Sequence, residues 1–105
     1  MLQVIRTERY ASWARSLRDD RAAAKIAIRV DRLAHGNAGD VKPVGGGVSE
    51  MRIDYGPGYR VYFARRGNTL ILLLCGGTKK SQTADVEDAK RLLADWKTDD
   101  QDRSI

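Results

Sequence analysis

Apolar positions at the start of the chain predict a strand followed by a helix. Residues 1–6 favour a short strand, with apolar side chains at Leu2, Val4 and Ile5. Thr7 then offers a helix N-cap, because its hydroxyl can accept a hydrogen bond from a free backbone N–H. The apolar face of the helix that follows repeats at helical spacing and consists of Tyr10, Trp13, Ala14 and Leu17.

A second helix is predicted after a break in this pattern. Asp19 and Asp20 mark the break and suit a new N-cap, and the helix ends near Gly36 and Asn37. Its apolar stripe consists of Ala23, Ile26, Ala27, Val30, Leu33 and Ala34. The two helices together predict a helical hairpin.

The middle of the chain reads as strands and turns, because all ten glycines and both prolines lie between Gly36 and Gly77. Apolar and polar residues alternate over 51–55 and again over 59–64, which is the period of a strand. The unbroken apolar run 70–75 is typical of a central strand covered on both faces. Three antiparallel strands are therefore expected, joined by turns at 56–58 and 66–68.

A last helix is predicted to begin near Ser81 or Thr83. Its apolar side is formed by Val86, Ala89, Leu92, Leu93 and Trp96. The expected fold is α+β, with a small antiparallel sheet, an N-terminal helical hairpin and a C-terminal helix in the order β-α-α-β-β-β-α. Residues 1–97 form the single expected domain, and the polar residues 98–105 form a C-terminal tail.

Length and composition limit the class of protein. A chain of 105 residues allows one domain with one core. Its longest apolar run is far shorter than the roughly 20 residues that span a bilayer, and charges at Arg6, Glu8 and Arg9 argue against a secretory signal. A single cysteine, Cys75, fits a reducing compartment. These features predict a cytoplasmic protein without a membrane partner.

Charge is distributed unevenly along the chain. The net charge is +5, but residues 1–80 carry about +8 and residues 81–105 carry −3. Such a basic body favours a polyanion such as nucleic acid, or an acidic protein partner. The alternative is a surface kept soluble by excess charge.

Metal and cofactor sites are not expected. His35 and Cys75 are each alone, without a cluster at ligand spacing, and His35 suits the end of a helix. The glycines at 45–47 lack the Lys-Ser or Lys-Thr of a phosphate loop, so they are read as a flexible loop or bulge.

The better candidate chemistry comes from basic residues on and after the strands. Arg52 and Arg60 alternate with core positions and so face the opposite side of the sheet, while Lys79, Lys80 and Gln82 follow the central strand. Converging cations could anchor RNA phosphates and stabilise the charge of a pentacovalent phosphorus transition state without a metal ion. The alternative is a solvated strand face followed by a basic turn.

Two segments carry a resemblance to a known family. Residues 56–63 (GPGYRVYF), residues 72–79 (LLLCGGTK) and Gln82 resemble the addiction-module killer proteins of the RelE/ParE toxin superfamily, in particular its HigB-like branch. The resemblance implies the toxin of a type II toxin–antitoxin pair, neutralised by a helix-turn-helix antitoxin. Many relatives cut mRNA in the ribosomal A site, so it further implies a metal-independent, ribosome-dependent endoribonuclease.

The same resemblance assigns residues. Arg60 matches the arginine used at the scissile phosphate and Arg52 the basic position on the preceding strand, while Lys79 and Lys80 occupy the region of the basic residue after the central strand. Relatives often have a Tyr or His near the start of the last helix as acid or base, whereas this chain has Ala84, Asp85 and Val86. By position, the substitutes for that base are Glu50, Asp54 and Asp85.

Other interpretations stay open at this point. Tyr59 and Tyr62 could stack on a base of the substrate, although packing in the core is the commoner role of such residues. The superfamily also contains ParE-like inhibitors of DNA gyrase that cleave nothing. A third possibility is a small RNA- or protein-binding module that has lost its catalytic group.

Overall fold

The computed structural model describes residues 1–103, with side chains described for residues 1–97. The elements are β1 (Gln3–Arg6), α1 (Glu8–Ser16), α2 (Asp20–Ala34), β2 (Val41–Gly45), β3 (Val48–Ile53), β4 (Tyr59–Arg66), β5 (Leu70–Thr78), the short 3₁₀ helix η1 (Lys79–Ser81) and α3 (Gln82–Arg103). The α+β class and the helical hairpin are as the sequence predicts.

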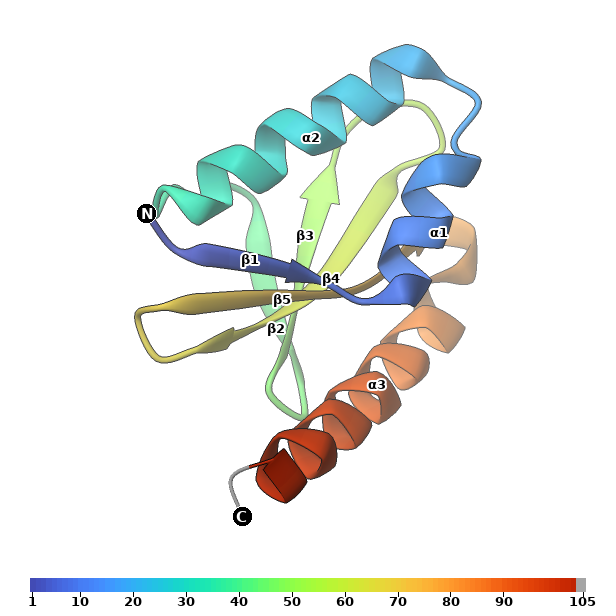
Figure 1. The fold of residues 1–105 in the computed structure, drawn as a ribbon. Helices are drawn as coiled ribbons and strands as arrows, with labels where there is room; N and C mark the ends of the chain where they lie inside the picture. The colour runs from blue at the N-terminus through green and yellow to red at the C-terminus, as the bar shows by residue number, and fades with distance from the viewer. Residues whose placement is uncertain (104–105) are drawn as a thin grey trace.

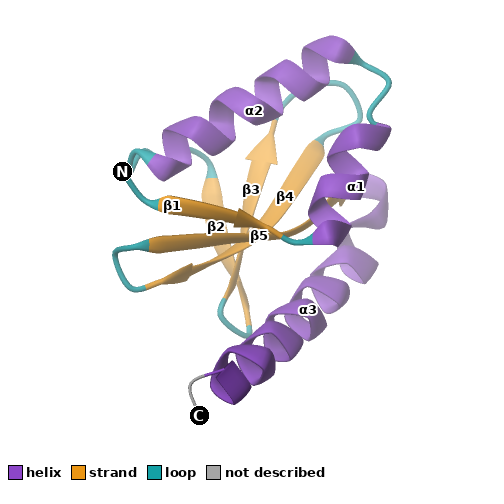
Figure 2. Ribbon diagram, viewed as in Figure 1, coloured by secondary structure: helices purple, strands orange, loops and turns teal. Residues whose placement is uncertain are grey.

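The strands form one five-stranded sheet in the order β1-β5-β4-β3-β2. Helices α1 and α2 cover one face of this sheet and α3 covers the other (Figures 1 and 2). Strands β2 to β5 pair antiparallel, but β1 lies parallel to β5. The three predicted antiparallel strands are confirmed, but the sheet is mixed because of β1. Helices α1 and α2 lead to β2 at the opposite edge, and the three hairpins that follow bring β5 beside β1 in the same direction.

A fourth strand in the middle region was also not predicted. Residues 41–45 form β2, which pairs with β3 through a tight turn at Gly46 and Gly47. Both turn glycines have positive φ, as a narrow hairpin requires. The glycine run is thus a hairpin connection rather than a flexible loop.

Side-chain caps fix the starts of the two N-terminal helices. The hydroxyl of Thr7 accepts from the backbone N–H of Tyr10 and donates to the carbonyl of Leu74 over 2.6 Å. Leu74 lies in a bulge of β5, where it and Cys75 oppose a single position on β4. Asp19 caps α2 by accepting from the N–H groups of residues 21 and 22.

Two hydrophobic clusters, one on each face of the sheet, make up the core. The cluster under α1 and α2 includes Ile26, Val30, Met51, Val61, Phe63 and Leu73. The cluster under α3 includes Val48, Tyr62, Leu72, Leu74, Ala89 and Leu93. The central strands are buried on both faces, as the apolar run 70–75 predicts.

The C-terminal helix runs past residue 98, where the predicted tail begins. The backbone of α3 continues to Arg103, while Ser104 and Ile105 lie outside the described residues. The division into a domain of residues 1–97 and a tail of 98–105 stays a prediction. No helix among the described residues is long and apolar enough to cross a membrane.

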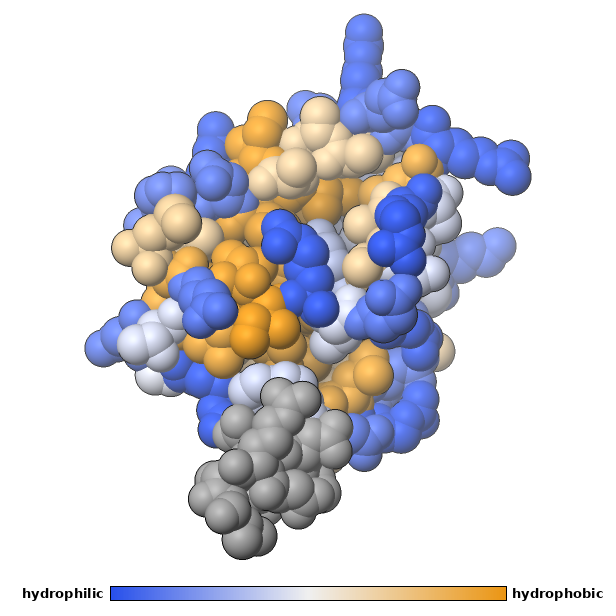
Figure 3. Space-filling model, viewed as in Figure 1, coloured by the Kyte–Doolittle hydropathy of each residue, from blue (hydrophilic) through white to orange (hydrophobic). Residues whose placement is uncertain are grey.

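Apolar side chains also gather on the surface between α2 and β1 (Figure 3). They line a hollow of about 680 Å³ between the helical hairpin and the edge strand, which includes Leu2, Val4, Leu17, Ile26 and Val30. Arg6 and Arg15 stand at this hollow. It lies apart from the predicted cations, none of which lines it.

Candidate functional site

Three of the four predicted cations meet at one cavity. The cavity measures about 440 Å³ and is lined by Asp40, Arg52, Asp54, Gly56, Pro57, Gly58, Arg60 and Lys79. It is formed by the 56–58 turn, the adjoining ends of β3 and β4 and the start of η1. Lys80 is exposed on η1 and is not among the lining residues, so the expected convergence of four cations is reduced to three.

Arg52 and Arg60 lie directly opposite each other. They are paired residues in the register of β3 and β4, which places both side chains on the same face of the sheet. The strand alternation in the sequence predicts this shared face correctly. Two guanidinium groups on neighbouring strands can bind the oxygens of one phosphate group together.

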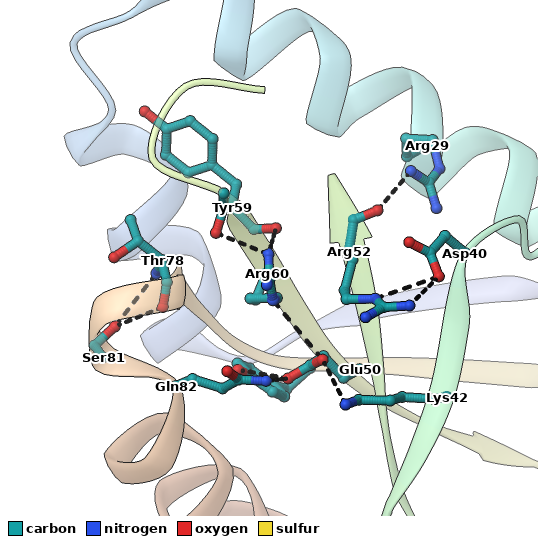
Figure 4. Close-up of polar contacts among 12 residues, drawn as sticks. Arg29, Asp40, Lys42, Glu50, Arg52, Tyr59, Arg60, Thr78, Ser81 and Gln82 are labelled. Carbon is teal, nitrogen blue, oxygen red and sulfur yellow. Dashed lines mark hydrogen bonds and ion pairs between the residues drawn. The ribbon is translucent and has the colours of Figure 1, made fainter. Parts of the chain in front are cut away.

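Arg60 is held closely by the protein. Its Nη1 donates to the carbonyl oxygens of Gly58, over 3.0 Å, and of Tyr59, over 3.3 Å (Figure 4). Gly58 has φ +78°, a conformation that glycine adopts without strain, and its carbonyl also accepts from the N–H of Lys79. The turn, Arg60 and η1 are therefore tied together, and only 11% of the Arg60 side chain is exposed.

Arg52 is paired with an acidic residue that the sequence analysis did not single out. Its Nη2 and Nε donate to Oδ1 of Asp40, over 2.8 and 3.3 Å. This hydrogen bond is the main cause that lowers the pKa of Asp40 and raises the pKa of Arg52. Both side chains are about half exposed, so an anion in the cavity can compete with Asp40 for Arg52.

Glu50 lies at the centre of the polar contacts and is fully buried. Its Oε2 accepts from the Tyr62 hydroxyl over 3.1 Å and from Nε2 of Gln82 over 2.7 Å. Nζ of Lys42, on β2, lies 3.9 Å from Oε1 (Figure 4). Lys42 could not be identified from the sequence, because nothing in the residues around it predicts the strand β2.

These contacts change the roles expected of three residues. Tyr62 is completely buried beneath α3, so a nucleobase of the substrate cannot stack on its ring. Burial and the neighbouring Glu50 raise the pKa of the Tyr62 phenol. The side-chain amide of Gln82 donates a hydrogen bond to Glu50, and Gln82 is not among the residues that line the cavity. Tyr59 faces the other side of β4 and packs edge-on against Trp13, with ring centroids 6.4 Å apart. For both tyrosines, the packing alternative is the one observed.

Of the three carboxylates proposed as a base, only Asp54 lines the cavity, and it is exposed. Glu50 is fully buried, and Asp85 is largely buried and accepts a hydrogen bond from the Ser81 hydroxyl. Among the side chains of residues 1–97, no three from His, Cys, Asp or Glu are placed together to hold a metal ion. His35 contacts the Asp31 carbonyl at the end of α2, as its position predicts.

Comparison with known proteins identifies a family model that matches most of the chain. Residues 12–97 match the family model described as phage-derived protein Gp49-like (DUF891). The chain belongs to this Gp49-like family. Every residue that lines the cavity falls within the matched Gp49-like region, whereas β1 lies before it.

A search for relatives finds similarity over a comparable length of chain. An uncharacterized protein of Haemophilus influenzae is 46% identical over 91 residues, which cover 87% of this chain and 92% of the relative. The similarity therefore extends over nearly the whole of both chains.

Proposed function

We propose that this Gp49-like protein is the toxin of a type II toxin–antitoxin pair and cleaves mRNA on the ribosome. The observation that carries the proposal is the direct pairing of Arg52 with Arg60 at a cavity that Lys79 completes. Membership in a phage-derived family and the resemblance of residues 56–63 to RelE/ParE toxins support it.

In the proposed reaction, the 2′-hydroxyl oxygen of one nucleotide attacks the adjacent phosphorus. The O2′–P bond forms as the P–O5′ bond breaks, which yields a 2′,3′-cyclic phosphate. The departing O5′ takes a proton from solvent water to become the free 5′-hydroxyl, and the proton removed from the 2′-hydroxyl finally returns to solvent. Asp54, the exposed carboxylate at the cavity, is assigned the proton of the 2′-hydroxyl. Arg60 and Arg52 balance the negative charge that accumulates on the phosphoryl oxygens. Because side-chain cations balance this charge, cleavage of free RNA by concentrated toxin should survive EDTA.

The decisive experiment replaces Arg60 by Ala. Loss of one aligned charged donor to a transition-state oxyanion lowers the rate by roughly 10²–10³. Arg91→Ala is the matched control, because it removes the same charge from the exposed side of α3. Primer extension on mRNA after induction reads cleavage, and circular dichroism checks folding. A folded Arg60→Ala protein that cleaves like wild type would contradict the proposal.

The gyrase alternative is tested in the same cells. Supercoiling of a reporter plasmid is measured beside primer extension. A nuclease leaves supercoiling unchanged while mRNA breaks accumulate. Loss of supercoiling with intact mRNA would instead assign the protein to the ParE-like inhibitors, and loss of neither would favour a binding module.

The proposal includes a helix-turn-helix antitoxin that covers the cationic face. The basic body of the chain, about +8 over residues 1–80, speeds capture of an acidic partner. A variant with Ala at Arg52, Arg60, Lys79 and Lys80 should bind the antitoxin more weakly and with a shallower salt dependence, since fewer charge contacts remain. Unchanged affinity and salt dependence would place the antitoxin elsewhere, with the helical hairpin of residues 7–34 as the next candidate.

A further inference from the structure

Glu50 is a fully buried carboxylate that does not line the cavity, so its place in the fold needs an explanation. Glu50 has no exposed surface, yet groups from three other elements reach it: Lys42 of β2, Tyr62 of β4 and Gln82 of α3. Burying a charge is unfavourable unless partners compensate it, and replacing such a group by an apolar one is often stabilising. A role in stability alone therefore explains Glu50 poorly.

The two oxygens of Glu50 do different things. Oε2 accepts both hydrogen bonds, from Tyr62 and from Gln82. Oε1 accepts none and instead faces two cations, with Nε of Arg60 at 3.7 Å and Nζ of Lys42 at 3.9 Å. Nε of Arg60 is likewise buried without a hydrogen-bond partner. The attraction between Oε1 and the guanidinium is thus electrostatic and acts in a buried environment, where solvent screens it little.

This contact completes the hold on Arg60. The turn carbonyls of residues 58 and 59 bind Nη1, and Glu50 lies beside Nε. Among the described residues, Nη2 has no protein partner. It is therefore the guanidinium nitrogen left for a ligand in the cavity that Arg60 lines.

We propose that Glu50 is a positioning residue for Arg60, fixing the guanidinium so that Nη2 is directed to a phosphate group in the cavity. The inference rests on the proposed RNA cleavage for its kinetic test, but not for its spectroscopic one. Glu50 itself touches no substrate; it acts through Arg60. Without its charge, the buried guanidinium loses the partner that sets its orientation.

Glu50→Gln isolates this role. With the amide oxygen in the place of Oε2, both hydrogen bonds from Tyr62 and Gln82 remain, and only the atom that faces Arg60 changes, from an acceptor to a donor. Removal of a negative charge near a polyanion should leave RNA binding unchanged or tighter. Positioning predicts the opposite effect on catalysis: kcat falls about 10- to 100-fold while KM does not rise.

Two variants complete the kinetic design. Glu87→Gln removes the same charge from an exposed site on α3 and should leave kcat unchanged. In an Arg60→Ala background, Glu50→Gln should cause no further loss, because the residue to be positioned is gone. Equal losses in both backgrounds, or a loss that follows reduced folding, would overturn the proposal. If Glu50→Gln does not fold, Glu50→Asp replaces it in the test, because it keeps the charge but moves the carboxylate away from Arg60 by one methylene. The positioning role predicts a reduced kcat for this variant.

A readout without RNA separates this inference from the proposed function. In a ¹H–¹⁵N spectrum, Nε–H of Arg60 should give a slowly exchanging signal, assigned by its loss in Arg60→Lys. Glu50→Gln should shift this signal and speed its exchange with water at least tenfold. A signal with the same position and exchange in both proteins would overturn the positioning role. If wild type cleaves no RNA but the signal responds, the proposed function fails and the positioning of Arg60 stands.

Discussion

Gly76 on β5 lies directly against the ring of Trp13 on α1. A Cβ atom built at this position would overlap the six-membered ring of Trp13, which packs there against the sheet. Gly76→Ala should therefore displace Trp13 and destabilise the protein by about 1–3 kcal/mol, the usual effect of overpacking. Denaturant unfolding followed by tryptophan fluorescence measures the change. Ser12→Ala, on the exposed side of α1, is the control and should change stability little.

The Tyr62 hydroxyl provides a second prediction at this scale. Tyr62→Phe removes one of two hydrogen bonds to the buried Oε2 of Glu50 and should lower the free energy of unfolding by about 1–3 kcal/mol. The matched variant is Tyr59→Phe, whose half-buried ring packs through its edge on Trp13. Its unfolding midpoint should stay close to that of wild type. Equal effects of the two substitutions would contradict this account.

At single residues, the sequence predicts the direction of a side chain better than its surroundings. Alternation correctly places Arg52 and Arg60 on one face, because the period of a strand is a local property. The same alternation puts Tyr62 on that face, but it does not reveal that α3 covers Tyr62 while leaving Arg60 at the cavity. Glu50 shows the same limit, since its burial depends on β2 and α3 together.

At the scale of one element, the N-cap of α2 is sensitive to acid. Hydrogen bonds from backbone N–H groups, chiefly that of Ala22, lower the pKa of Asp19 below its ordinary value of 3.8. A lowered pKa in the folded state means that the cap stabilises the protein above the unfolded-state pKa and is lost as pH falls through the folded-state pKa.

Asp19→Ala should accordingly lower the thermal midpoint at pH 7, and the difference from wild type should shrink as the solution is acidified below about 3.8. Asp19→Asn keeps a good N-cap that does not titrate, so it should match wild type at pH 7 and show a weaker acid dependence. Thermal unfolding followed by circular dichroism at pH 7, 5, 4 and 3 checks both. A constant difference between Asp19→Ala and wild type across this range would show that the cap carboxylate contributes nothing.

Local signals predict the three helices and β1, but they miss the strand β2 and the parallel pairing of β1. Caps at Thr7 and Asp19 and apolar stripes at helical spacing are readable from neighbouring residues. β2 contains Pro43 and ends in Gly45, which argue against a strand unless it lies at a sheet edge, as it does here. The parallel pairing of β1 depends on a partner nearly seventy residues away, so no local pattern reports it.

The whole molecule depends on α3 to close one side of the sheet. A chain that ends at Arg91 would lack Leu92, Leu93 and Trp96, which cover the cluster containing Tyr62 and Leu72. Loss of three such contacts, worth about 1.5–3 kcal/mol for each large apolar side chain, approaches the whole stability of a small domain. We expect this chain to lose cooperative unfolding, whereas a chain ending at Lys97 keeps it.

The rate at which Cys75 is alkylated distinguishes a folded chain from the chain that ends at Arg91. The Cys75 thiol is buried in the same cluster, and burial raises its pKa to about 12, so it should resist alkylation in the intact protein. In the chain that ends at Arg91, alkylation should proceed at the rate of an unfolded peptide. Protection of Cys75 in that chain would show that α3 is dispensable for the cluster.

The pairing of β1 with β5 has a consequence for the order in which the protein assembles. Gln3 pairs with Leu70 and Arg6 with Leu73, so each contact closes a loop of most of the chain, whereas β2 to β5 join through short turns. Closing a long loop costs entropy before any contact compensates it. Strand β1 is therefore expected to pair last, after the antiparallel strands β2 to β5 have formed. Substitutions in β1 should then speed unfolding while leaving the folding rate nearly unchanged, which stopped-flow kinetics of Val4→Ala would reveal.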